Sequence, residues 1–182
     1  MIVIGGATAT GKTALAVEVA KQVNGEIIGA DSMQIYKKMN VGTAKPTERE
    51  KCGIMHYMID IVEPNEPYSV AEYKKQATGI IERIRQKGKV PIIVGGTGLY
   101  INALIFDYTP FARNDELRNE LKAEYETCGA EYMHKKLCSI DPKAGEIIHF
   151  NNVKRVLRAL EVKLLTGESV TDKCDKEAAV PA

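Results

Sequence analysis

Residues 6–13 are Gly6-Ala7-Thr8-Ala9-Thr10-Gly11-Lys12-Thr13, and this stretch decides the fold. It matches the pattern G-x-x-x-x-G-K-[ST], with an apolar β-branched run before it at residues 2–4 and a helix-forming segment after it at residues 12–23. In that context the glycines let backbone N–H groups converge on an anion, and the positive end of the helix adds to their field. We therefore expect residues 6–13 to bind phosphate or pyrophosphate. Lys12 would supply a full charge, and the Thr13 hydroxyl would ligate Mg²⁺.

Outward from this loop, the first hundred residues alternate strand and helix signals. Strands are predicted at residues 2–4, 26–30, 57–62 and 90–94, and helices at residues 12–23 and 69–87. Ser69 and Glu72 form a capping box at the start of the second helix, and Gly88 ends it. Fully apolar strands between helices are typical of a parallel sheet covered on both faces, so we predict an α/β fold of the P-loop NTPase type.

The second part of the sequence is helical. Helices are predicted at residues 114–127, 130–139, 142–148 and 153–166, with Gly129 and Gly167 as stop signals. We therefore expect three parts: a catalytic core at residues 1–105, an all-helical insertion at residues 106–170, and a frayed tail at residues 171–182.

Composition excludes several classes of protein. The 182 residues include 25 Lys and Arg against 24 Asp and Glu, so the chain is not a strongly basic nucleic-acid binder, although a local basic patch is allowed. The sequence contains no run of about 18 apolar residues, so no membrane span is predicted. The four cysteines form no C-x-x-C pair, which favours reduced thiols in a cytoplasmic protein over a metal knuckle or a disulfide framework.

Two further motifs follow predicted strands. Asp31-Ser32-Met33-Gln34-Ile35-Tyr36 comes after the second strand, at the edge of the sheet where ligands bind. Asp31 is there either a base or metal ligand, or only a helix cap. Gly95-Gly96-Thr97-Gly98 follows the fourth strand, where two glycines permit close approach by a ligand or by another loop. Thr97 either caps the next helix or contacts a substrate.

Two basic features carry weaker signals. Gly42-Thr43-Ala44-Lys45-Pro46-Thr47 predicts a turn with one exposed lysine. Lys154, Arg155 and Arg158 lie within one turn of a helix and could grip nucleic-acid phosphates, but a solvated face is the commoner role for such a cluster.

Taken together, the motifs resemble a known family. In order along the chain they are residues 6–13, Asp31-Ser32-Met33-Gln34-Ile35-Tyr36, Val41-Gly42-Thr43-Ala44-Lys45-Pro46, His56-Tyr57-Met58-Ile59-Asp60-Ile61, Pro67-Tyr68-Ser69-Val70, Gly95-Gly96-Thr97-Gly98-Leu99-Tyr100, Asp141-Pro142, His149 and Arg158-Ala159-Leu160-Glu161-Val162. This ordered set resembles the tRNA dimethylallyltransferases, which prenylate the adenine 3′ of the anticodon, over about residues 1–167.

The resemblance implies a reaction and a set of roles. Residues 6–13 would bind the pyrophosphate of dimethylallyl diphosphate, with Mg²⁺ as cofactor. Lys12, Asp31 and Thr97 would be catalytic, and Asp31 would be the general base for the adenine N6 amine. The implied tRNA contacts are Asp31, Ser32, Met33, Gln34, Thr97, Arg118, Lys154, Arg155, Val156, Leu157 and Arg158. The resemblance further implies a cytoplasmic monomer that binds the anticodon arm.

Three other functions stay open. A small-molecule P-loop kinase would share the phosphate loop, and a related prenyltransferase would act on a free adenine nucleotide. A third reading is an inactive RNA-binding fragment, because members of the family run well past the length of this chain. On that basis we expect the 182 residues alone to bind diphosphate weakly and to transfer the prenyl group poorly.

Overall fold

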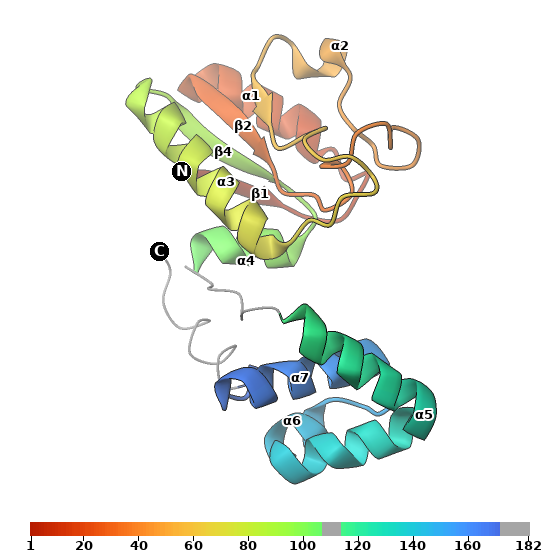
Figure 1. Ribbon diagram of the computed structural model, residues 1–182. Coiled ribbons are helices and arrows are strands. Elements are labelled where there is room, and N and C mark those ends of the chain that lie inside the picture. Colours follow the sequence, from red (N-terminus) through yellow and green to blue (C-terminus); the bar gives the residue numbers. More distant parts are fainter. Residues whose placement is uncertain (107–113, 172–182) are drawn as a thin grey trace. The chain divides into compact units, whose positions relative to one another are not determined.

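A four-stranded parallel sheet forms the centre of the first part of the molecule (Figure 1). The structure is a computed structural model and describes residues 1–106 and 114–171. The strands are β1 (Ile2–Gly5), β2 (Gly25–Gly29), β3 (His56–Tyr57) and β4 (Val90–Gly95), in the spatial order β1-β4-β2-β3. The predicted parallel α/β sheet is confirmed.

Helices cover both faces of this sheet (Figure 1). They are α1 (Lys12–Val23), α3 (Val70–Gln86) and α4 (Gly98–Ile105), and a short α2 (Glu48–Lys51) lies between β2 and β3. Adjacent residues of one strand point to opposite faces. Ile27 and Ile92 therefore pack with α1, while Ile28 and Ile93 pack with α3 and α4.

The third predicted strand is wrong in its extent. Only His56 and Tyr57 pair with β2, against the prediction of a strand over residues 57–62. Met58 and Asp60 adopt left-handed backbone with φ of 62° and 55°, which breaks the extended run. Beyond this break, Val62 forms an isolated parallel bridge with Tyr36, outside the strands of the sheet.

The second part of the molecule is all-helical. It contains α5 (Asp115–Ile140), α6 (Pro142–Ile147) and α7 (Val153–Thr166). The two helices predicted over residues 114–139 form α5, which is broken at Gly129, where φ is 80° and ψ is 175°. The hydrophobic core of this helical part is built from Leu121, Met133, Leu137, Ala144, Ile148, Val156, Ala159 and Leu160.

The chain thus divides into two compact units, one before and one after the segment 107–113, and each is described by itself. We call them the catalytic unit, after the role predicted for it from the sequence, and the helical unit. The predicted tail lies outside the described residues from position 172 onward. Within the described ranges we find no helix with the length and apolarity of a membrane span.

Candidate active site

Three loops meet at the carboxyl edge of the sheet, because β1, β4 and β2 are neighbours. They are the phosphate loop (residues 6–13) after β1, the site turn (residues 31–36) after β2, and residues 96–97 after β4. Hydrogen bonds join them: the Gly6 N–H donates to the Gly95 carbonyl (3.3 Å), and the Thr97 N–H donates to the Ala30 carbonyl (3.0 Å). These bonds tie the phosphate loop and the residues that follow β2 to the loop after β4.

Glycine at position 95 is required by this meeting of loops. A Cβ atom there would lie 2.0 Å from the Ala30 carbonyl oxygen and 2.3 Å from its carbon. No real contact is that short, so any side chain at this position would force β4 away from the end of β2. The sequence-based interpretation of Gly95 as a point of close approach by another loop is confirmed.

The phosphate loop is held by contacts among its own residues. Gly11 is left-handed with φ of 81° and leads directly into α1, whose first N–H groups have no partner within the helix. Lys12 Nζ donates to the Ala7 carbonyl, and the Thr10 hydroxyl donates to the same oxygen (2.8 Å). The Lys12 ammonium therefore lies over the exposed loop, where an anionic ligand would compete with that carbonyl for it.

The site turn is organised by Asp31, and no helix follows it. Asp31 Oδ1 accepts hydrogen bonds from the N–H groups of Met33 (2.9 Å) and Gln34 (3.4 Å). This is an Asx turn rather than the helix cap that the sequence also allowed. Among the described residues, no group donates to Asp31 Oδ2, so that oxygen is available to a ligand.

Thr97 acts on the site turn as well. Its hydroxyl oxygen accepts the Ser32 N–H (2.9 Å) and lies 3.3 Å from the Ser32 hydroxyl, to which it donates. Thr97 sits at the N-cap position of α4, yet its side chain makes no capping hydrogen bond. The side chain of Thr97 therefore does not cap α4 and is bonded to the site turn instead.

A stack of tyrosines lies behind the site turn. The Tyr73 and Tyr100 rings stack with their centroids 4.0 Å apart, and the Tyr73 hydroxyl donates to the Gly29 carbonyl (3.1 Å). Burial, together with the smaller effects of the nearby Tyr36 and Asp31, raises the pKa of Tyr100 to about 12. Tyr100 is therefore neutral at physiological pH, and it adds an uncharged wall near Asp31.

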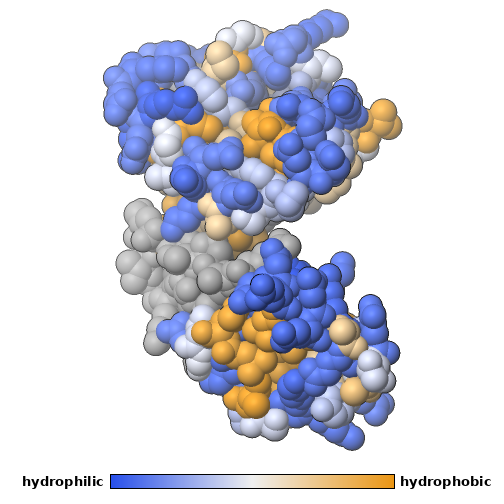
Figure 2. Space-filling view, in the orientation of Figure 1, coloured by the Kyte–Doolittle hydropathy of each residue, from blue (hydrophilic) through white to orange (hydrophobic). Residues whose placement is uncertain are grey.

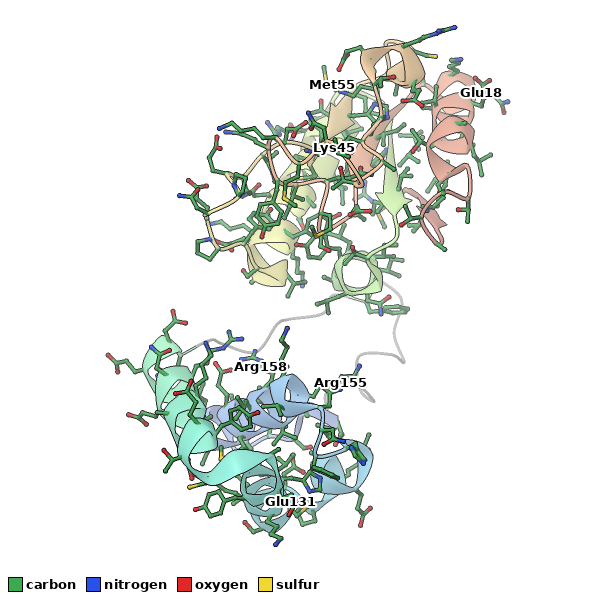
Figure 3. The ribbon with its side chains drawn as sticks, turned by 90° about the vertical axis from the view of Figure 1, so that its right-hand side faces the viewer. Glu18, Lys45, Met55, Glu131, Arg155 and Arg158 are labelled. Atoms are coloured by element: carbon green, nitrogen blue, oxygen red, sulfur yellow. The ribbon has the colours of Figure 1, made fainter. Side chains whose placement is uncertain are left out.

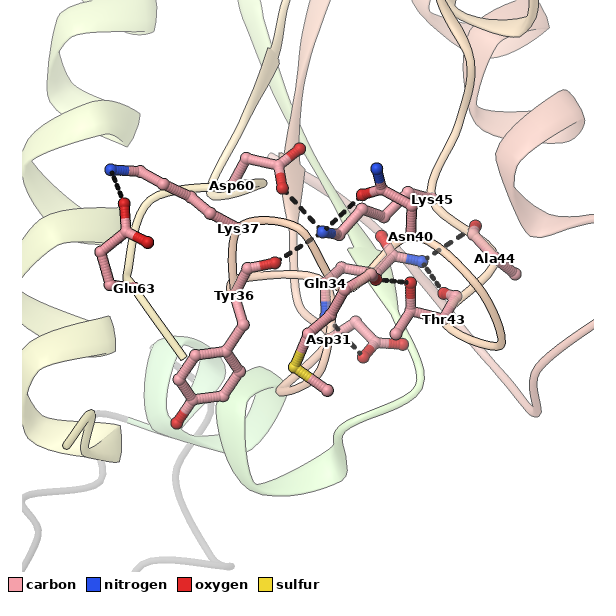
Figure 4. Close-up of polar contacts among 11 residues, drawn as sticks. Asp31, Gln34, Tyr36, Lys37, Asn40, Thr43, Ala44, Lys45, Asp60 and Glu63 are labelled. Carbon is pink, nitrogen blue, oxygen red and sulfur yellow. Dashed lines mark hydrogen bonds and ion pairs between the residues drawn. The ribbon is translucent and has the colours of Figure 1, made fainter. Parts of the chain in front are cut away.

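Lys45 was predicted to be exposed, and this is wrong (Figure 4). Its side chain is only 7% exposed, and its ammonium donates to Asp60 Oδ1 (2.6 Å), Tyr36 O (2.5 Å) and Asn40 Oδ1 (3.2 Å). Nothing in the local sequence distinguishes it from a surface lysine, because its three acceptors come from segments that only the fold brings together.

The residues of the phosphate loop suit a Mg²⁺ ion that is coordinated partly by the protein and partly by a bound phosphate. Among the described residues, no three His, Cys, Asp or Glu side chains form a cluster that could hold a metal ion. Mg²⁺ commonly takes only one or two protein ligands and completes its shell with phosphate oxygens and water. The Thr13 hydroxyl, in the first turn of α1, fits that donor set.

The basic helix predicted from sequence is α7, in the helical unit. Lys154 and Arg155 are exposed, and Arg118 is exposed on α5. Arg158 pairs with the buried Glu161 (2.9 Å), and Figure 3 shows Arg155 and Arg158 projecting from one side of this unit. The site turn belongs to the catalytic unit. The predicted tRNA contacts therefore include residues of both units.

Two of the predicted contacts on α7 are apolar and largely enclosed. The Val156 residue is 1% exposed in the core of the helical unit, so its side chain faces away from any ligand, and Leu157 packs against the same core. Arg155 and Arg158 border a cavity of about 490 Å³ lined also by Ile147, Ile148, Ala159, Val170 and Thr171. Figure 2 shows apolar side chains gathered on one face of this unit, and Ile147 is 66% exposed.

Comparison with known proteins agrees with this geometry. The family model described as IPP transferase matches residues 34–181. The tRNA dimethylallyltransferases of Acetivibrio thermocellus and Caldanaerobacter subterraneus subsp. tengcongensis are 56% and 53% identical over 173 residues. That alignment covers 94% of this chain and 55% of each relative, so the chain spans about half the length of the curated relatives it matches.

Solved structures give the same result. The full-length tRNA isopentenylpyrophosphate transferase of Bacillus halodurans is 46% identical, with a TM-score of 0.60, over 92% of this chain and 56% of that chain. A eukaryotic dimethylallyltransferase acting on tRNA is 30% identical with a TM-score of 0.80, over 97% of this chain and 44% of that one. From the family match, the identity to these relatives and the shared fold, we conclude that the chain belongs to the IPP transferase family.

Proposed function

We propose that this chain transfers a dimethylallyl group from dimethylallyl diphosphate to N6 of the adenine 3′ of the anticodon in tRNA, and that diphosphate is released. The observation that carries this proposal is the meeting of the phosphate loop, Asp31 and Thr97 at one edge of the sheet, joined by the Thr97–Ser32 hydrogen bond of 2.9 Å. An anion site and a carboxylate side by side suit a reaction in which an anion leaves while a proton is removed.

The bond changes can be assigned to residues. The C1–O bond of the allylic diphosphate breaks, and the oxygen keeps the electron pair. Lys12 and the loop N–H groups stabilise the charge that develops on the leaving diphosphate. Mg²⁺ held by Thr13 and the phosphate oxygens would add Lewis-acid stabilisation of the same charge.

Asp31 performs the proton transfer. The N6 amine forms the new N–C1 bond and loses a proton, and Asp31 Oδ2 accepts it. Oδ1 is held by two backbone N–H groups of the site turn, so the carboxylate is oriented before the substrate arrives. The adenine must leave the anticodon stack to reach this carboxylate.

The remaining polar groups of the site turn and the helical unit would bind the RNA. Ser32, Met33, Gln34 and Thr97 lie beside Asp31 and would contact the target adenine and its neighbours. Arg118, Lys154, Arg155 and Arg158 would contact phosphates of the anticodon arm, and Leu157 and Val156 support α7 by packing. This division leaves base recognition to the catalytic unit and backbone contacts to the helical unit.

The experiment offers the chain two labelled donors and one acceptor. An anticodon stem-loop with adenine 3′ of the anticodon is incubated with Mg²⁺ and either ¹⁴C-dimethylallyl diphosphate or γ-³²P-ATP. The proposal expects ¹⁴C in the RNA and no transfer of ³²P to it. Label transferred from ATP would instead identify a kinase. Salt-sensitive stem-loop binding without any transfer would identify an RNA-binding fragment.

A further inference from the structure

Lys45 has no role in the reaction described above, yet it is one of the most enclosed charged side chains of the catalytic unit (Figure 4). An ammonium has three N–H donors, and here each one has an acceptor: the carbonyl oxygen of Tyr36 and the side-chain oxygens of Asn40 and Asp60. A buried lysine satisfied in this way holds its partners in place, because releasing any one of them leaves an unpaired polar group.

The three acceptors belong to separate segments around the site turn. Tyr36 ends the site turn itself, Asn40 lies in the loop that follows, and Asp60 lies after β3. We call this arrangement the lysine clamp, meaning Lys45 with Tyr36, Asn40 and Asp60. Asp60 is the anionic member, and it adopts left-handed backbone with φ of 55°. That uncommon conformation is held in part by the clamp.

Backbone hydrogen bonds carry the clamp to the residues of the site. The Asp60 N–H donates to the Gln34 carbonyl (3.1 Å), and the Ile61 N–H donates to the Ile35 carbonyl (2.8 Å). The side-chain amide of Gln34 donates to the carbonyls of Thr43 (2.9 Å) and Ala44 (3.1 Å), next to Lys45 in the sequence. The site turn is therefore bonded on two sides to segments that Lys45 ties together.

We propose that Lys45 is a positioning residue that fixes the site turn for the RNA base, without contacting the substrate. The proposal rests on the proposed function above, because the site turn supplies Asp31 and its neighbours to the adenine. Among the described residues, a hydrogen bond from Gly6 joins the phosphate loop to Gly95, and no hydrogen bond joins that loop to the clamp. Loss of Lys45 should therefore weaken RNA binding and spare diphosphate binding.

The test compares Lys45→Met with Lys21→Met. Both remove a lysine that pairs with an acid at 2.6 Å, but the Lys21 side chain is 44% exposed and lies in the last turn of α1, away from the phosphate loop. For Lys45→Met we expect the Kd of the anticodon stem-loop to rise about tenfold because the site turn is no longer held in place, with the Kd of pyrophosphate unchanged within about twofold. Lys21→Met should change neither Kd.

A purely structural role for Lys45 predicts a different result. It would raise both Kd values together or leave both unchanged while the melting temperature falls, and either outcome would overturn the proposal. If Lys45→Met does not fold, Asn40→Ala removes one acceptor of the clamp and should raise the stem-loop Kd by about threefold, again without effect on pyrophosphate. Equal stem-loop Kd values for Asn40→Ala and wild type would also overturn it.

Hydrogen exchange separates failure of this proposal from failure of the proposed function. In Lys45→Met, the N–H groups of Lys37, Asp60 and Ile61 should exchange faster, while those of β2 and β4 keep their wild-type rates. This readout needs no RNA. If the wild-type chain binds no stem-loop, the proposed function fails and the positioning role fails with it. If it binds and the exchange rates are unchanged, only the clamp is wrong.

Discussion

The two edges of the sheet each enclose a charged side chain, but the partners of the two charges differ. At the amino edge, Glu26 has a side chain 5% exposed and accepts hydrogen bonds from Lys89 (2.7 Å), Tyr57 (2.8 Å) and Lys87 (3.2 Å). At the carboxyl edge, Lys45 has a side chain 7% exposed and donates to one backbone and two side-chain oxygens.

This difference separates stability from function. The partners of Glu26 stand on β3 or just before β4, in segments that the sheet itself holds in register. The partners of Lys45 stand in loops, which have no other regular structure to fix them. Loss of the Glu26 charge at the amino edge should therefore alter the free energy of unfolding, and loss of the Lys45 charge at the carboxyl edge should alter ligand binding.

The largest effect is expected for Asp31→Asn at the carboxyl edge. Asparagine keeps the oxygen that accepts from Met33 and Gln34, so the site turn is preserved, but it cannot take the N6 proton. We expect the rate of dimethylallyl transfer to fall by about 10³-fold, within the usual range for a lost general base. The measurement is single-turnover transfer to the stem-loop. A melting temperature equal to that of wild type is the control, and transfer at the wild-type rate would exclude Asp31 as the base.

Gly95→Ala tests how closely the carboxyl edge is packed. The new Cβ would meet the Ala30 carbonyl at 2.0 Å, so the free energy of unfolding should fall by about 3 kcal/mol. Urea denaturation measures this loss.

A matched glycine exists in α3. A Cβ at Gly79 would have no atom within 4 Å, so Gly79→Ala should raise the free energy of unfolding by about 0.5–1 kcal/mol through helix propensity. A lower free energy of unfolding for Gly95→Ala and a higher one for Gly79→Ala would show that close packing is specific to the carboxyl edge. A loss at both positions would show that packing around Gly95 is not the cause.

Glu26→Ala probes the amino edge. It removes the acceptor of the half-buried Tyr57 hydroxyl and of two lysines, so we expect the free energy of unfolding to fall by about 2 kcal/mol. The pyrophosphate and stem-loop Kd values should match those of wild type, since within the described part of the chain the side chain of Glu26 is bonded to Tyr57, Lys87 and Lys89 and to no residue of the phosphate loop or site turn. A change in either Kd would contradict the view that Glu26 contributes to stability alone.

The sequence predicted much of the fold and of the site, and the misses share a physical cause. The phosphate loop, α1 and α7 follow from local patterns, so residues 12–23 and 153–166 were predicted with their observed bounds. The end of β3 depends on left-handed backbone at Met58 and Asp60, and methionine, where the break begins, rarely adopts that backbone. The burial of Lys45 depends on segments up to 15 residues away in the chain. Local patterns of residues predict helices and the phosphate loop, whereas the sequence does not predict contacts between segments that only the fold brings together.

The smallest effect concerns pH at the amino edge. Burial raises the pKa of Glu26, but hydrogen bonds from Lys89, Tyr57 and Lys87 outweigh it, and the pKa lies below its ordinary value of 4.5. A lowered pKa in the folded state means that the unfolded state binds more protons. The stabilisation is therefore complete above pH 4.5 and is lost as the pH falls through the folded pKa.

The measurement is the urea midpoint of wild type and Glu26→Gln as the pH is lowered from 7 to 3. Burial also lowers the pKa of His56 below 6.5, so both proteins should lose stability as the pH falls below that value. Only the difference between them isolates Glu26. That difference should be constant above pH 4.5 and shrink below it, because glutamine has no proton to gain. A difference that stays constant down to pH 3 would mean that the charge of Glu26 does not contribute to the free energy of unfolding.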